Sequence, residues 1–296
     1  MTAGHIPVMT AEALRFLEPG RGGVFVDCTL GLGGHAKAML EAGASRVIGI
    51  DRDTDALAAA RVTLAPWAEK TELVHSDYRA ISSVLDGLDV AVVDGALADL
   101  GVSSMQFDAP GRGFSFQRDE PLDMRMDRTS GETAAQLIAD ADERELADTI
   151  YAYGEERFSR RIARAIVEAR REAPIDTTLR LAAIVRRAVP SRGYQRIDPA
   201  TRTFQALRIW VNRELDGLDA FLLAAATRLR AGARLVVITF HSLEDRIVKH
   251  TLRGLEKSAD AALKVLTKKP VIPGDDEIAR NPRARSAKLR AAERLA

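Results

Sequence analysis

Three glycines close to the amino terminus could leave the main chain accessible to a nucleotide-like ligand. Gly31, Gly33 and Gly34 follow the apolar run 24–27, and a helix-like run begins near His35. A buried strand, a glycine-rich turn and a helix form the usual ligand-binding unit of α/β domains, because glycine has no side chain to block the approach. The pattern therefore predicts a binding turn, and the alternative is an ordinary βαβ unit without a ligand.

Acidic and aromatic residues follow the next two apolar runs. The run 46–51 ends in Asp51, at a distance from the glycines that is typical of an acid accepting hydrogen bonds from ribose hydroxyls. The run 71–75 is followed by Asp77 and Tyr78. Tyr78 could stack on an adenine ring while Asp77 accepts from its amino group. In the alternative interpretation, Tyr78 is a residue at the rim of the core.

A fourth apolar run, 90–94, precedes a long segment without a regular period. Residues 97–116 contain three glycines, and a loop of this length inside a compact domain is usually functional or disordered. Three phenylalanines, Phe107, Phe114 and Phe116, argue against disorder. We expect this loop at the carboxyl ends of the strands, with phenylalanines that either stack on a target base or anchor the loop to the core.

The pattern changes to helix alone between about residues 129 and 199, where apolar residues recur at helical spacing without an intervening strand. Strand-like runs then resume at 234–240, 263–266 and 286–290. This order predicts an α/β fold with a mainly parallel sheet. Residues 1–104 and 201–296 would form its two parts, and residues 105–200 would form an all-helical insertion.

Length and composition are those of a globular protein. The chain has 296 residues, of which 46% are hydrophobic, and a formal net charge of +1 at pH 7. Its one cysteine, Cys28, rules out an intrachain disulfide and argues against a cysteine-based zinc site. No apolar run approaches the roughly 18 residues of a membrane span, and the start lacks a secretory signal. We therefore expect a cytoplasmic protein with no membrane partner.

A strongly basic segment is hidden by the nearly neutral total. Between residues 157 and 213, fourteen arginines stand against four acidic residues, which is a local charge of +10. Such a charge suits a polyanion such as nucleic acid. The alternative is compositional, since this chain prefers arginine to lysine throughout.

Two cofactor classes fit the glycine turn. Gly31, Gly33 and Ala36 formally match the dinucleotide fingerprint, so an oxidoreductase with a nicotinamide or flavin cofactor is one hypothesis. Such an enzyme needs a second half for the other nucleotide and a base for hydride chemistry, and neither is recognisable. S-adenosylmethionine needs a glycine turn, an acid for the ribose and an adenine pocket, which the first three strands offer. A further hypothesis is an RNA-binding assembly factor without catalysis.

Distinctive motifs run through the chain at 5–9, 27–35, 50–53, 99–104, 112–116, 122–127, 203–209, 240–246 and 285–290. In sequence and in order they closely resemble the bacterial 16S ribosomal RNA cytosine-N4-methyltransferases. The resemblance implies a class I methyltransferase fold, with a Rossmann-like, mainly parallel seven-stranded sheet and a helical insertion that binds the substrate. It implies methyl transfer from S-adenosylmethionine to the exocyclic N4 of a cytidine in the decoding region of 16S ribosomal RNA, in the small subunit. A homodimer is a further assembly to test.

The resemblance also implies a set of cofactor contacts, which are Gly33, Gly34, His35, Asp51, Tyr78, Asp99 and Gln106. The chain departs from the usual family pattern at Met105, where proline is common, and at Asp198, where histidine is frequent. No departure removes a group that we assign to the chemistry.

The residues around Asp99 could carry this reaction without a covalent intermediate. A cytosine amino group is a poor nucleophile, and a carboxylate or a loop carbonyl can orient it and take its proton as the methyl group is transferred. We therefore assign the catalytic role to Asp99 and to the loop through Ser103 and Ser104, where cofactor and target base are expected to meet. Ser103 and Ser104 lack the neighbours of a hydrolase triad.

The histidines do not predict a metal site. His5, His35 and His241 are far apart in the sequence and lack spaced ligand pairs, so we assign no metal. His35 is expected to line the cofactor site, and His241 is either structural or faces the base. Ser242 is the predicted cap of the helix after His241, with Asp245 at the reciprocal position.

Overall fold

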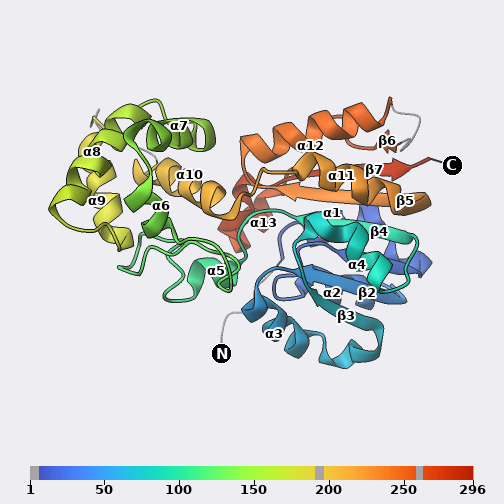
Figure 1. Cartoon of the computed structure of the whole chain (residues 1–296). Helices are drawn as coiled ribbons and strands as arrows, with labels where there is room; N and C mark the ends of the chain where they lie inside the picture. Colours follow the sequence, from blue (N-terminus) through green and yellow to red (C-terminus); the bar gives the residue numbers. More distant parts are fainter. Residues whose placement is uncertain (1–6, 191–196, 258–262, 296) are drawn as a thin grey trace. The chain divides into compact units, whose positions relative to one another are not determined.

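The computed structural model describes residues 7–190, 197–257 and 263–295, although the side chains of Ser104 and Met105 lie outside that description. The chain divides into two compact units, drawn in Figure 1. The first comprises Met1–Gly101 and Gly217–Ala296, and the second comprises Val102–Asp216. The second unit is therefore inserted into the chain of the first, in the way that the helix-only segment predicts.

A seven-stranded sheet forms the centre of the first unit. Its strand order is β3-β2-β1-β4-β5-β7-β6. The strands from β3 to β5 are parallel, whereas β7 is antiparallel to both β5 and β6. The bounds are β1 Val24–Asp27, β2 Arg46–Asp51, β3 Thr71–His75, β4 Val93–Asp99, β5 Leu229–Thr239, β6 Leu263–Val265 and β7 Lys288–Arg294. This sheet confirms the predicted fold class.

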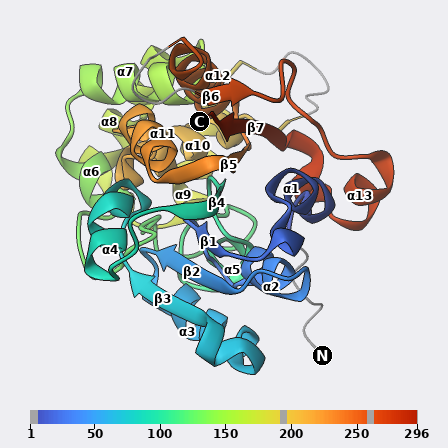
Figure 2. The ribbon, with the colours of Figure 1, turned by 90° about the vertical axis from the view of Figure 1, so that its right-hand side faces the viewer.

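Helices cover both faces of this sheet, which is why its central strands read as nearly continuous apolar runs. Apolar residues of α4, α11 and α12 pack on one face, and those of α1, α2 and α3 pack on the other. Figure 2 shows α4 and α11 on one side of β1 and β4, with α1 and α2 on the other. The bounds are α1 Thr10–Leu17, α2 Gly34–Glu41, α3 Thr54–Thr63, α4 Ile81–Gly87, α11 Leu218–Thr227, α12 Ser242–Leu255 and α13 Asp275–Arg280.

The fourth strand differs from its prediction. The structure places β4 at Val93–Asp99, so the predicted strand at 90–94 and the loop that should begin at 97 were wrong. Asp94 lies inside the strand, at the register shift between Val93 and Gly95, and does not end it. Its carboxylate accepts a hydrogen bond from the N–H of Val24 at 2.8 Å and lies 3.2 Å from the guanidinium of Arg230. Because this pairing satisfies Asp94, the strand continues and ends at Asp99.

The second unit is built around helices. They are α5 Ser104–Asp108, α6 Ala134–Asp140, α7 Glu143–Gly154, α8 Ser159–Glu172, α9 Thr178–Ala188 and α10 Ala200–Asn212. Phe204 and Leu207 of α10 belong to the core of this unit, together with Ile150 of α7 and Ile162 of α8. The unit therefore extends to Asp216, beyond the predicted boundary at 200, because the apolar face of α10 is buried against the insertion's own helices.

The sequence from Pro199 to about Leu229 predicts one helix with a bend near Gly217, and this prediction was also wrong. The chain forms α10 and α11, and it changes direction between them. Arg213 and Gly217 have φ angles of 49° and 66°, in the left-handed region that ends a helix. Among the described residues, no helix combines the length and the apolar character needed to cross a membrane.

Candidate active site

Three acidic residues gather at one edge of the sheet in the first unit. Asp27 ends β1, Asp51 ends β2 and Asp99 ends β4. Because β1 lies between β2 and β4 and runs parallel to both, all three carboxylates reach the carboxyl edge together. Asp27 experiences the negative charges of both neighbours. The site is thus acidic before any ligand is considered.

Hydrogen bonds connect these acids to the turn after β1. The carboxylate of Asp51 accepts from the N–H of Gly31 at 2.7 Å and from the N–H of Asp53 at 2.8 Å. The N–H of Asp99 donates to the hydroxyl of Thr29 at 2.6 Å. Burial raises the pKa of Asp51 more than the two N–H groups lower it. Hydrogen bonds therefore connect the ends of the three strands to the turn.

The turn itself excludes side chains. Gly33 has a φ of 79° and precedes α2 as its N-cap residue. A Cβ on Gly34 would lie 2.4 Å from Cγ of Pro7, which is too close for any residue with a side chain. The absence of a side chain at Gly34 therefore allows Pro7 to pack against the main chain at the start of α2. A helix N-terminus is also a place where unpaired N–H groups can meet a polar ligand group.

His35 is buried at the start of α2, beside Asp99. Its Nε2 lies 3.4 Å from Oδ2 of Asp99, and the two side chains are 7% and 22% exposed. Burial lowers the pKa of His35, but the contact with Asp99, aided by the charges of Asp27 and Glu277, raises it above its usual value. The side chain of His35 is therefore an ion-pair partner of Asp99. The prediction had placed it only in the lining of the cofactor site.

Asp27 is the least expected member of this group. It is fully buried, and its Oδ1 accepts from the N–H of Thr29 at 3.2 Å. Burial raises its pKa to about 6, against the opposing effects of His35 and the Thr29 N–H. Among the described residues, Oδ2 of Asp27 and Oδ1 of Asp99 have no hydrogen-bond partner. Buried acceptors without donors are costly, which indicates that a ligand or water supplies them.

The end of β3 changes one prediction. Asp77 accepts from the backbone N–H and the guanidinium of Arg79, and the guanidinium of Arg52 lies 3.7 Å away. Although burial opposes it, these contacts lower the pKa of Asp77 below its usual value. Both carboxylate oxygens are thus engaged by Arg79, so an adenine amino group would have to compete with an arginine for Asp77.

Tyr78 is buried, and its ring meets that of Phe221 edge to face with centroids 4.6 Å apart. It belongs to the core cluster on the α4–α11 face of the sheet. This position favours the interpretation of Tyr78 as a residue at the core rim. Contact with a cofactor at its remaining 9% exposed surface stays a prediction.

The loop residues Ser103 and Gln106 belong to the second unit. The N–H of Ser103 donates to the side-chain oxygen of Gln106 at 2.9 Å, and the N–H of Gln106 donates to the Ser103 hydroxyl at 3.2 Å. This reciprocal arrangement closes the first turn of α5, which gives both side chains a structural role. Their predicted catalytic and cofactor contacts, and that of Ser104, stay predictions.

The three phenylalanines of the loop have different environments within the second unit. Phe114 is buried in its core, and Phe116 packs edge to face on Phe204 with centroids 4.7 Å apart. Both anchor the loop, as the second of the two interpretations holds. Phe107 is 38% exposed, which makes its ring the most exposed of the three.

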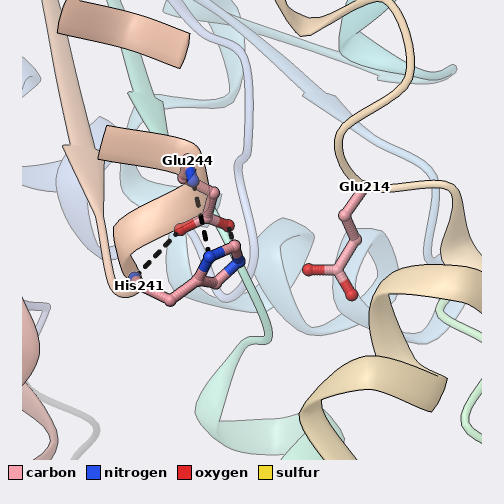
Figure 3. Close-up of side chains that lie close together, drawn as sticks. All are labelled: Glu214, His241 and Glu244. Atoms are coloured by element: carbon pink, nitrogen blue, oxygen red, sulfur yellow. Dashed lines mark hydrogen bonds and ion pairs between the residues drawn. The ribbon is translucent and has the colours of Figure 1, made fainter. Parts of the chain in front are cut away.

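His241 has a structural role at the start of α12. Its Nδ1 accepts from the N–H of Glu244 at 3.4 Å, and its Nε2 lies 3.1 Å from Oε1 of the same residue (Figure 3). The other carboxylate oxygen of Glu244 accepts from the N–H of Phe240 at 2.9 Å. The predicted cap at Ser242 with Asp245 was therefore displaced by one residue. Asp245 instead pairs with Arg290 at 2.6 Å. His5 lies outside the described residues.

The arginines of the second unit fall into two groups. Some are used internally: Arg186 pairs with Asp198 at 2.8 Å, and Arg170 donates to two main-chain oxygens. Others are exposed on α8 and α9, namely Arg160, Arg161, Arg171 and Arg187. The local charge of +10 therefore overstates the available basic surface, but a row of exposed guanidinium groups is present. Arg192 and Arg196 lie outside the described residues.

The acidic edge of the first unit fits a cationic ligand group. Three clustered carboxylates would repel a pyrophosphate, which opposes the dinucleotide hypothesis. A sulfonium or an ammonium group would instead be stabilised there, and Asp51 remains near the surface for ribose hydroxyls. S-adenosylmethionine carries these groups, so the residues present fit it. Sequence reasoning omitted Asp27 and Thr29, although the position of Asp27 immediately before the glycine turn was an available signal.

Comparisons with known proteins found one family that matches almost the whole chain. The profile of the MraW methylase family matches residues 2–295. A curated protein of Sorangium cellulosum, "Ribosomal RNA small subunit methyltransferase H", is 55% identical over 291 residues, covering 98% of this chain and 91% of the relative. A protein of the same name from Nitratidesulfovibrio vulgaris is 51% identical over 310 residues, covering 99% of this chain and 96% of the relative.

A solved structure was also found with low similarity. The crystal structure of an rRNA methylase from Streptococcus thermophilus aligns with a TM-score of 0.44 and 12% sequence identity. The alignment covers 99% of this chain and 100% of that chain.

Proposed function

The chain belongs to the MraW methylase family, and from this premise we propose that it methylates small-subunit ribosomal RNA with S-adenosylmethionine as the donor. The acceptor is the exocyclic N4 of a cytidine in the decoding region of 16S ribosomal RNA. Bacterial small subunits are assembled in the cytoplasm, so a cytoplasmic location follows from this substrate. The observation that supports the proposal most is the acidic edge formed by Asp27, Asp51 and Asp99 next to the glycine turn that precedes α2.

The cofactor would be held by residues of the first unit. The main chain of the turn at Gly33 and Gly34 would hold its methionine part, and the carboxylate of Asp27 suits its cationic end. Asp51 is positioned for the ribose hydroxyls, since its carboxylate is already oriented by the N–H groups of Gly31 and Asp53. When bound, the cofactor supplies an electrophilic methyl carbon, whose bond to sulfur breaks with the electron pair left on sulfur.

Asp99 performs the acid–base part of the reaction. Its carboxylate accepts a hydrogen bond from the target amino group, which orients the N4 lone pair, and takes the N4 proton as the new bond to carbon forms. Positioning supplies much of the remaining acceleration, because the leaving group is already good. Cys28 is buried and plays no part as a nucleophile.

The second unit supplies RNA contacts. Its exposed arginines on α8 and α9 would bind phosphates, and arginine is suited to this because its planar group donates several hydrogen bonds at once. The exposed ring of Phe107 can stack on an unpaired base. A target cytidine must leave its stack before its amino group can be methylated, so a stacking residue in the loop is required.

The test uses small subunits from cells that lack this protein. Incubation with the purified protein and isotopically labelled S-adenosylmethionine should yield one labelled N4-methylcytidine, detected by mass spectrometry of the digested RNA. Asp99→Asn should lower the rate at least about 100-fold while leaving the fold intact. Binding of S-adenosylhomocysteine without any product would favour the assembly-factor hypothesis. Binding of a nicotinamide cofactor in its place would favour the oxidoreductase.

A further inference from the structure

The two oxygens of the Asp99 carboxylate have different surroundings in the first unit. Oδ2 lies 3.4 Å from Nε2 of His35, whereas Oδ1 is buried without a hydrogen-bond partner among the described residues. The backbone N–H of Asp99 is held by the hydroxyl of Thr29 at 2.6 Å. The residue is therefore held at its main chain, and its Oδ2 lies within ion-pair distance of His35, whose Nε2 makes no hydrogen bond among the described residues. A carboxylate has about four lone-pair sites, so most of its accepting capacity remains for another donor.

His35 is itself held in place from several directions. It is the second residue of α2, and its side chain is almost completely buried. The charged groups that act on it are Asp99 from β4, Asp27 from β1 and Glu277 from α13. Glu277 also accepts from the N–H of Met9 at 2.6 Å, which connects α13 to the segment before α1. Burial and these three acidic groups together restrict the imidazole.

We propose that His35 is a positioning residue of the methyl transfer, which orients the Asp99 carboxylate towards the target amino group. This inference rests on the proposed function, because it assigns a role to a side chain that family membership connects only with the cofactor. His35 acts through Asp99. It donates no proton in the reaction, and the proton that leaves N4 ends on the Asp99 carboxylate.

The physical reason is that a proton acceptor with a mobile side chain lowers the reaction rate. An aspartate at a strand end can adopt several side-chain rotamers, and only some present an oxygen to a given point. Small displacements of a catalytic group can reduce a rate about 100-fold. The contact with His35 removes this freedom before the substrate arrives. The negative charge of Asp27 favours the protonated imidazole, so that His35 remains the donor and Asp99 the acceptor in the pair.

A double-mutant cycle tests the proposal. The variants are His35→Ala, Asp99→Asn and the combination, with His35→Gln as a conservative change and His250→Gln, on the exposed side of α12, as the matched control. The turnover rate on small subunits and the dissociation constant of S-adenosylhomocysteine are measured for each. His35→Ala should lower kcat about 10- to 100-fold and change cofactor affinity less than about 3-fold. In the Asp99→Asn background, the same change should lower kcat less than about 3-fold.

Each outcome has a clear meaning. Partial rescue by His35→Gln, whose amide can still donate to Asp99, would support positioning. Equal effects of His35→Ala in both backgrounds would overturn the proposal, because His35 would then act independently of Asp99. Loss of cofactor affinity with unchanged kcat would also overturn it and make His35 a cofactor contact. Absence of product with the unmodified protein would instead refute the proposed function.

A second measurement does not depend on catalysis or on the folding of a His35 variant. The titration of His35 is followed by nuclear magnetic resonance in the unmodified protein and in Asp99→Asn. The pKa of His35 should be raised in the former and should fall towards the ordinary value in the latter, even though Asp27 and Glu277 remain. An unchanged titration would mean that the two side chains are not paired in solution, and it would overturn the proposal.

Discussion

Oδ2 of Asp51 accepts a hydrogen bond from the N–H of Gly31 at 2.7 Å, so the acid that ends β2 is attached to the turn that follows β1. The second oxygen accepts from the N–H of Asp53 at 2.8 Å. Two backbone donors thus orient this carboxylate before a ligand arrives. The same bonds explain why a residue with a single acceptor oxygen cannot replace it without loss.

Asp51→Asn is expected to weaken binding of S-adenosylhomocysteine by about 10- to 100-fold, since the amide can satisfy only one of the two N–H donors and accepts poorly from ribose hydroxyls. Isothermal titration calorimetry measures the change. Glu69→Gln, at an exposed position after α3, is the control and should bind normally. Equal affinities of Asp51→Asn and the unmodified protein would remove Asp51 from the ribose site.

Gly34→Ala should disturb the turn directly. The new Cβ would lie 2.4 Å from Cγ of Pro7, so either the segment before α1 or the start of α2 must move. We expect weaker cofactor binding and a lower melting temperature, both measurable by thermal shift with and without S-adenosylhomocysteine. Gly87→Ala in α4 meets nothing within 4 Å and should be neutral or slightly stabilising. Similar behaviour of the two variants would contradict the close approach.

Asp27→Asn should raise stability at high pH while it weakens cofactor binding. The folded-state pKa of Asp27 is about 6, above the ordinary 3.8, so the folded protein binds its proton more tightly than the unfolded chain does. Stability from this group is therefore present at low pH and is lost as the pH rises from about 4 to about 6. At pH 8 the variant should be more stable by up to about 3 kcal/mol, and this advantage should vanish near pH 4.

Urea denaturation at several pH values measures the free energy of unfolding of both proteins. The same variant should bind S-adenosylhomocysteine more weakly, because the buried counter-charge of the cationic end is lost. Asp55→Asn, at an exposed position in α3, should show neither effect. A stability difference that does not depend on pH would show that Asp27 is not the group that titrates.

The role of Tyr78 can be assigned by comparing three substitutions. Tyr78→Phe keeps the contact with Phe221 and should retain both stability and cofactor affinity. Tyr78→Ala empties a buried site and should lower the free energy of unfolding by about 3–5 kcal/mol. If affinity for S-adenosylhomocysteine, corrected for the unfolded fraction, falls no further than stability requires, Tyr78 is a core residue. A specific loss of affinity in Tyr78→Leu, at preserved stability, would instead support contact with the adenine.

The exposed arginines should determine the salt dependence of substrate binding. Replacing Arg160, Arg161 and Arg171 by alanine should weaken binding of small subunits at low salt. The slope of log K against log salt should fall by about one for each phosphate that is no longer neutralised. Arg144→Ala on α7, where the guanidinium lies 3.7 Å from Asp148, is the control. Fluorescence anisotropy at several salt concentrations gives both slopes. An unchanged slope in the triple variant would place the RNA-binding surface elsewhere.

Local sequence patterns predicted much of the fold. The glycine turn, the acid at the end of β2 and the helix-only insertion were predictable because each depends on residues within one short segment. The apolar runs also predicted a mainly parallel sheet, since strands covered by helices on both faces lack alternation. The end of β4 was not predictable in this way, because Asp94 resembles a strand end until its partners, Val24 and Arg230, are known.

The family and the main elements could be predicted from the chain alone, because its motifs are long and its periodicities local. The use of the strand-end acids depends on the assembled fold. Asp51 is engaged by Gly31, and Asp99 by His35, which lies far from it in the sequence. Burial of Asp27 depends on both neighbouring strands. Charge pairing and desolvation are properties of the assembled sheet edge, and no segment read alone contains them.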